Sequence, residues 1–164
     1  MEADLRYPIG KAELTDTLAP DARVAHIRAI EEAPARLRAA VRGLSDQQLD
    51  TPYRPGGWTV RQVAHHVPDS HMNAYIRFKL ALTEDQPTIK PYEEARWAEL
   101  ADSRSPIEPS LVLLENLHRR WVLLLSSLSP ADWGKKSTIQ QWEFFRSIAR
   151  LGFMPGMAAI TSLT

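Results

Sequence analysis

Apolar residues recur along most of this chain at spacings of three and four, the period of an α-helix with one buried face. The first such stretch runs from Ala22 to Val41 and is followed by Gly43, a residue type that commonly ends helices. Its predicted buried stripe consists of Val24, Ile27, Ile30, Leu37 and Val41. Residues 1–20 lack this period and carry turn signals, so we expect an extended arm there.

A second, longer helix is predicted from Val60 to about Thr83. Thr59 stands where its side chain can cap the helix, and Gln62 follows three residues later, which together form a capping-box pattern. Pro68 lies inside this helix and removes one of its backbone hydrogen bonds. We expect a kink that packing tolerates.

The third long helix begins at Pro109–Ser110, after a proline-rich connector that spans residues 84–109. Within the connector, Glu93 to Leu100 is predicted to form a short helix with Trp97 turned inward. The apolar face of the third helix comprises Leu111, Leu114, Leu117, Trp121, Leu124, Leu125 and Leu128. His118 lies on the same stripe, which favours a histidine in or beside the core over a metal ligand.

Two shorter helical turns are predicted where Ser45 precedes Gln48 and where Ser129 precedes Asp132. No stretch alternates with the period of a strand, and no internal repeat is present. The pattern therefore predicts an all-α fold, an antiparallel bundle, and a single domain over residues 1–164.

The composition excludes several classes of function. Twenty Lys and Arg balance twenty Asp and Glu, which argues against a nucleic-acid partner held by charge. There is no cysteine, hence no disulfide framework and no thiol chemistry of the protein itself. No apolar run is long enough to span a membrane, and the first residues lack the core of a signal peptide. We expect a soluble cytoplasmic protein without a membrane partner.

Candidate chemistry is concentrated in the central helix, where three of the five histidines fall within seven residues. These are His65, His66 and His71, and the carboxylate of Asp69 lies among them. One helix supplies two ligands to a metal only from positions three or four apart, so adjacent His65 and His66 cannot both bind from this helix. A metal site, an acid–base site and hydrogen-bonded structural imidazoles all remain open on spacing alone.

The segment from Trp58 to Val67 resembles the YfiT-type branch of the DinB-like proteins, a family described as metal-dependent hydrolases. The likeness extends over residues 5–135. It includes Leu5-Arg6-Tyr7-Pro8-Ile9-Gly10, Asp69-Ser70-His71-Met72-Asn73 and Leu117-His118-Arg119-Arg120-Trp121.

This resemblance implies a DinB-like four-helix bundle that forms a homodimer and binds one zinc or nickel ion per subunit. In the family three histidines hold the metal, and the one on the central helix corresponds to His66. The other two lie four residues apart on the last helix, and three nitrogens with a water make an open site. Such an ion lowers the pKa of its water, which would then attack a small-molecule substrate.

The C-terminal segment, residues 137–164, departs from the family and contains no histidine. Met157 and Thr161 stand where the two remaining ligands would fall, so the last helix is expected to be atypical or incomplete. Back-translation of the segment from Met154, regrouped one base earlier, is compatible with Tyr-Ala-Trp-His-Gly-Arg-His-His-Ile-Ala-His, the family motif. We therefore hypothesise a frameshift near Lys135–Ser137.

Three functional classes follow from these observations. The first is a metal-dependent hydrolase whose activity is impaired by the missing ligands. The second is a thiol transferase, in which the metal ionises a thiol in place of water. The third is a bundle without metal or catalysis.

Overall fold

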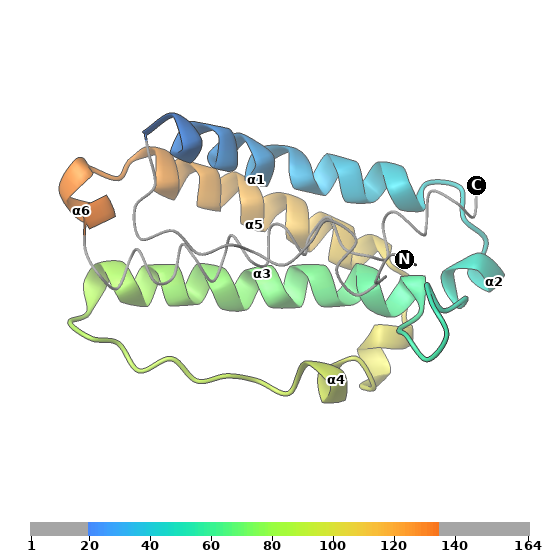
Figure 1. Ribbon diagram of the computed structural model, residues 1–164. Coiled ribbons are helices and arrows are strands. Elements are labelled where there is room, and N and C mark those ends of the chain that lie inside the picture. Colours follow the sequence, from blue (N-terminus) through green and yellow to red (C-terminus); the bar gives the residue numbers. More distant parts are fainter. Residues whose placement is uncertain (1–19, 135–164) are drawn as a thin grey trace, which may run out of the picture.

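The computed structural model describes residues 20–134, and this part of the chain is helical (Figure 1). Three long helices lie side by side, and the third packs against both of the others. They are α1 (Pro20–Val41), α3 (Val60–Thr83) and α5 (Glu108–Ser126). The short elements are α2 (Asp46–Leu49), α4 (Glu94–Trp97), η1 (Ala101–Arg104) and α6 (Pro130–Gly134).

The all-α prediction is confirmed over residues 20–134, where the only extended pairing is an isolated bridge between Pro52 and Thr59. The predicted arm before α1 and the predicted aberrant segment at 137–164 lie outside the described residues.

Local signals set the helix ends. At α2 the Gln48 amide donates to Ser45 Oγ at 3.3 Å, and at α3 the Gln62 amide donates to Thr59 Oγ1 at 3.1 Å. The glutamine side chains accept from the cap amides in return, so both capping boxes are complete. After α1, Gly43 adopts a φ of 75°, a conformation that suits a residue without a Cβ.

Two sequence predictions concern single positions on the long helices. The helix predicted from Val60 to about Thr83 is confirmed as the continuous α3, which Pro68 does not end; the kink expected at Pro68 stays a prediction. Val24 was assigned to the buried stripe of α1, and this is wrong, because its side chain is 67% exposed. At about 100° per residue it points roughly 120° away from Ile30, the centre of that stripe.

The apolar core has two parts. One lies around the first half of α3 and contains Leu37, Val41, Leu49, Val60, Val63, Val67, Leu111 and Leu114. The other surrounds the second half of α3 and contains Ile30, Ala74, Phe78, Trp121, Leu125 and Trp133. The predicted face of α5 is buried except that Leu124 and Leu128 are half-buried. Trp97 is also half-buried, with its ring centroid 4.6 Å from that of Tyr92.

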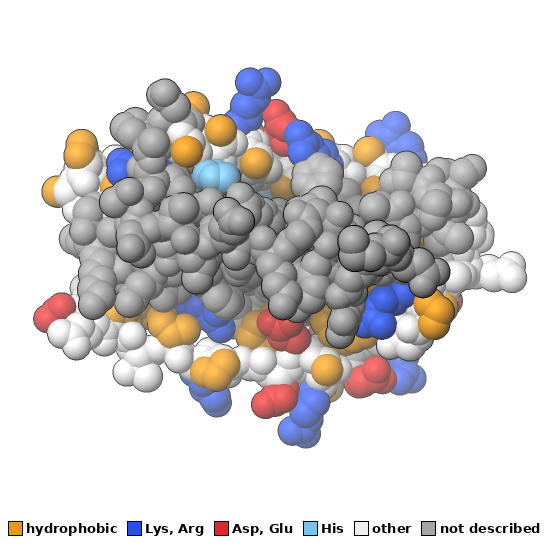
Figure 2. All heavy atoms as spheres, viewed as in Figure 1, with side chains coloured by type: hydrophobic (Ala, Val, Ile, Leu, Met, Phe, Trp, Pro, Cys, Tyr) orange, Lys and Arg blue, Asp and Glu red, His pale blue; other side chains and the backbone are white. Residues whose placement is uncertain are grey.

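The described surface is mixed in character. Figure 2 shows exposed apolar side chains scattered among charged ones. Within residues 20–134, no helix has the length and apolar content needed to cross a membrane.

Candidate functional site

The loop before α3 places an aromatic ring over the histidine segment. The Tyr53 amide donates to the Trp58 carbonyl at 3.1 Å, and the Val60 amide donates to the Thr51 carbonyl at 3.2 Å. Gly56, with a φ of 66°, allows the chain to reverse between these bonds. As a result, the Trp58 ring lies edge-on to His66, with 4.7 Å between ring centroids.

His66 differs from its neighbours because no described residue hydrogen-bonds to its imidazole. Its side chain is half-buried beneath Trp58. Desolvation lowers the pKa of His66 to about 4, so the ring is neutral at physiological pH. A neutral imidazole keeps a nitrogen lone pair, which is the form that binds a metal or accepts a proton.

His65 is buried and points toward the chain between η1 and α5. Its Nε2 lies 3.0 Å from the Ser105 carbonyl, and its Nδ1 lies 2.7 Å from Ser110 Oγ. Because a carbonyl only accepts, Nε2 carries the proton, and in the neutral ring Nδ1 accepts from the serine hydroxyl. Both nitrogens of His65 are hydrogen-bonded, so its role is structural and no lone pair is available for a metal.

His71 and His118 form a buried pair between α3 and α5. His71 Nδ1 lies 2.6 Å from His118 Nε2, and His118 Nδ1 lies 2.6 Å from the Ile30 carbonyl of α1. Desolvation lowers the pKa of His118 to about 4 and that of His71 well below its usual value. The prediction of a core histidine at 118 is confirmed, since its side chain is 1% exposed.

Asp69 follows His66 by three residues and is half-buried. Burial, together with the nearby Asp102 carboxylate, raises the pKa of Asp69. The structure does not bring Asp69, His65, His66 and His71 around a common point, since His65 faces the connector and His71 pairs with α5.

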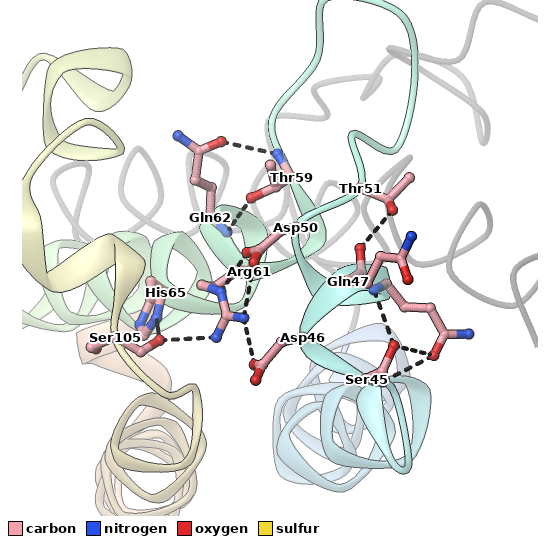
Figure 3. Close-up of polar contacts among 11 residues, drawn as sticks. Ser45, Asp46, Gln47, Asp50, Thr51, Thr59, Arg61, Gln62, His65 and Ser105 are labelled. Atoms are coloured by element: carbon pink, nitrogen blue, oxygen red, sulfur yellow. Dashed lines mark hydrogen bonds and ion pairs between the residues drawn. The ribbon is translucent and has the colours of Figure 1, made fainter.

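Sequence reasoning missed the role of Arg61, one turn before His65. Arg61 is buried, with 7% of its surface exposed. Its guanidinium donates to Asp50 Oδ1 at 2.6 Å, Asp46 Oδ1 at 2.7 Å and the Ser105 carbonyl at 3.3 Å (Figure 3). These bonds raise the pKa of Arg61 and lower that of Asp50. The sequence signal was an arginine flanked by the buried positions Val60 and Val63.

Other α3 side chains hold the connector between α3 and α5 by its backbone. Gln62 Nε2 donates to the Ala98 carbonyl at 2.8 Å, and Arg77 Nη2 donates to the Lys90 carbonyl at 3.2 Å. We call Arg61, Gln62, His65 and Arg77 the connector face of α3. This face is structural and leaves His66 as the candidate for chemistry.

A three-imidazole metal centre does not fit the residues that this chain offers. The remaining histidine, His26, lies on α1, and neither residues 1–19 nor 135–164 contain a histidine or a cysteine. Within residues 20–134, no group of three His, Cys, Asp or Glu side chains is arranged to hold a metal ion. One imidazole alone does not make a usable zinc site.

Residues 29–159 match the model of the DinB superfamily, which is most of the chain. The chain belongs to the DinB superfamily. The resemblance seen in the sequence is thus confirmed at the level of the family.

Two proteins similar to this DinB chain are named as metal-dependent hydrolases. A protein of Bacillus mycoides (strain KBAB4) is 60% identical over 129 residues, which cover 79% of this chain and 75% of the relative. A protein of Bacillus cereus (strain AH820) is 59% identical over the same shares. Both are named "Putative metal-dependent hydrolase".

A solved structure supports the fold. YfiT from Bacillus subtilis, described as "a probable metal-dependent hydrolase with an unusual four-helix bundle topology", superimposes with a TM-score of 0.89 at 42% identity. The match covers 98% of this chain and 95% of YfiT. The predicted four-helix-bundle fold is therefore confirmed for this DinB chain.

Proposed function

We propose that this protein is built as a metal-dependent hydrolase in which His66 is the metal ligand contributed by α3, and that its sequence after residue 136 leaves the metal centre incomplete. The observation that carries the proposal is the contrast among the histidines. His65, His71 and His118 are held in hydrogen bonds, whereas His66 is neutral and has no such bond to a described residue. The names of the relatives support a metal-dependent reaction.

The same proposal includes the identity of the metal, the substrate class, the location and oligomeric state of the protein, and the reason for the missing ligands. The ion is zinc or nickel, since both accept imidazole nitrogen, and the substrate is a small molecule. The protein is a cytoplasmic homodimer. In this chain the positions of the two further ligands are occupied by Met157 and Thr161, which offer no imidazole. A frameshift near Lys135–Ser137 accounts for this difference, and the genomic DNA at these codons tests it directly.

Metal content tests the proposal. The chain as it stands, its His66→Ala variant and a variant with residues 154–164 replaced by Tyr-Ala-Trp-His-Gly-Arg-His-His-Ile-Ala-His are each loaded with zinc or nickel and dialysed. Elemental analysis should find about one ion per chain in the replaced variant and far less in the other two. Adding His66→Ala to the replaced variant should remove the ion.

Two outcomes would contradict the proposal. Stoichiometric metal in the unchanged chain that is lost with His66→Ala would show that its own C-terminal segment supplies ligands. A replaced variant that folds but binds no metal would exclude His66 as a ligand of the metal centre.

Assays of ester and amide hydrolysis, run beside a thiol-conjugation assay on the metal-loaded variant, distinguish a hydrolase from a thiol transferase. Sedimentation equilibrium checks the expected dimer.

A further inference from the structure

The Ile30 carbonyl in α1 lacks its usual helical donor. In an α-helix each carbonyl accepts from the amide four residues later, and residue 34 is a proline, which has no N–H. His118 of α5 takes the place of that donor, with its Nδ1 2.6 Å from the Ile30 oxygen. A buried carbonyl without a partner is costly, so the proline and the histidine act as a matched pair across two helices.

This contact fixes the protons of two rings. Since a carbonyl only accepts, His118 Nδ1 carries the proton, and its Nε2 in the neutral ring must accept. His71 Nδ1 lies 2.6 Å from that nitrogen and must therefore donate, which leaves the lone pair of His71 on Nε2. The two ring planes differ by 12° with centroids 4.8 Å apart, as expected for rings bonded in line through their edges.

The surroundings keep both rings neutral. The Trp121 ring lies edge-on to His71 and to His118, with centroids 6.4 Å and 6.0 Å away. Its neighbours in the core, Ile30 and Phe78, are apolar and fully buried. A charge on either ring would lose its hydration there, and the lowered pKa values of both histidines agree with this.

We propose that His118 is a positioning residue which, anchored on the carbonyl that Pro34 leaves without a donor, holds His71 in the tautomer whose Nε2 is unprotonated and accepts hydrogen bonds. His71 lies five residues after His66 on α3, so the same helix carries two neutral imidazoles, each with one unprotonated nitrogen. His71 accepts hydrogen bonds from hydroxyl groups or water and does not donate at neutral pH. This inference stands apart from the proposed function, because the tautomers exist without metal.

Imidazole ¹H–¹⁵N correlation spectra of the uniformly ¹⁵N-labelled, metal-free full chain at pH 7 test the proposal. We expect protonated Nδ1 and unprotonated Nε2 for both His71 and His118. A protonated Nε2 on either ring, or a charged ring, would overturn it.

Variants separate positioning from simple packing. In His118→Gln the amide can donate to Ile30 and accept from His71, so the His71 tautomer should be retained. In His118→Leu the ratio of Nε2–H to Nδ1–H forms of His71 should rise at least about fivefold, the change that the loss of one ordinary hydrogen bond produces. Equal His71 spectra in the two variants would refute the positioning role.

Pro34→Ala keeps the test available if His118→Leu does not fold. The new amide at residue 34 competes for the Ile30 carbonyl, so the Nε2–H form of His118 should rise, again by about fivefold. Pro68→Ala is the matched control, since it also removes a buried helix proline but creates no donor near Ile30. A Pro34→Ala spectrum identical to that of the control would refute the role assigned to Pro34.

Discussion

The connector face of α3 and the site around His66 lie on one helix, where His65 and His66 are adjacent, but they are organised in opposite ways. On the connector face, Arg61 donates to two carboxylates and a carbonyl, and both nitrogens of His65 are bonded. His66, the next residue, has an aromatic ring at its edge and no hydrogen bond to any described residue. The first arrangement fixes the backbone of a long connector, whereas the second leaves a neutral nitrogen for chemistry.

This difference shows that hydrogen-bond saturation, more than residue type, separates a structural histidine from a candidate ligand. Of the four histidines on α3 and α5, His65, His71 and His118 are buried and have partners that the fold fixes. His66 is half-buried and has no hydrogen bond to a described residue. The comparison can be tested by replacing the hydrogen-bonded residues of the connector face, by replacing His66, or by lowering the pH until the buried rings are protonated.

The largest effect is expected from acid, which should penalise the buried rings. The pKa of His118 is about 4 in the folded protein, against an ordinary 6.5. Between these two pH values His118 is protonated in the unfolded chain and neutral in the folded one, which favours unfolding. Stability should therefore fall between pH 6.5 and about 4, by roughly 3 kcal/mol for this group.

Urea unfolding of the wild type and of His118→Gln at pH 7 and pH 4 measures this loss. Carboxylates with lowered pKa values, such as Asp50, lose stability at the acid end in both proteins, so their contribution cancels. A loss of the same size in both proteins would show that His118 does not titrate as described.

A smaller effect is expected from Arg61→Met, which removes the bonds that join α2 and the Ser105 carbonyl to α3. The loss should be about 2 kcal/mol, because hydrogen bonds to charged groups are worth more than neutral ones but both carboxylates are exposed to solvent. Chemical denaturation measures it. Arg104→Met is the matched control, because Arg104 is an exposed arginine that lines one surface pocket together with Arg61, and it should cost less than about 0.5 kcal/mol. Equal losses would place the stability of this region elsewhere.

The smallest effect, and the sharpest comparison, is between two adjacent alanine variants. His65→Ala should cost about 1.5 kcal/mol, since it leaves the Ser110 hydroxyl without its imidazole partner. His66→Ala should cost roughly a third of that, because only the contact with Trp58 is lost. Thermal and urea unfolding of the two proteins give the difference. A reversal of the order would mean that His66 is the structural histidine of the pair.

Much of the fold was predictable because its signals are local. Each capping box lies within four residues, and the starts of α1 and α5 fall within two residues of the predicted positions. The placement of His118 followed from its position on the leucine stripe. Val24 was misplaced because three-residue spacing alone does not fix the centre of a buried stripe on a helix.

The distinction between His65 and His66 could not be predicted from the sequence. Adjacent residues point about 100° apart, and which of them meets a partner depends on where the connector runs. Helix α3 holds the connector mainly by its carbonyl groups, which every residue has, so the side-chain sequence of the connector carries little signal for its course. The pairing of Pro34 with His118 joins residues 84 positions apart and needed the structure for the same reason.

The connector has one more property that follows from how α3 holds it. Among the bonds of Arg61, Gln62, His65 and Arg77, those that reach the backbone of the connector end on the peptide oxygens of Lys90, Ala98 and Ser105. Every amino acid, proline included, retains that oxygen. The loop can thus change its outward chemistry extensively while following the same path, which makes it a natural place for related proteins to diverge without disturbing the helices beneath.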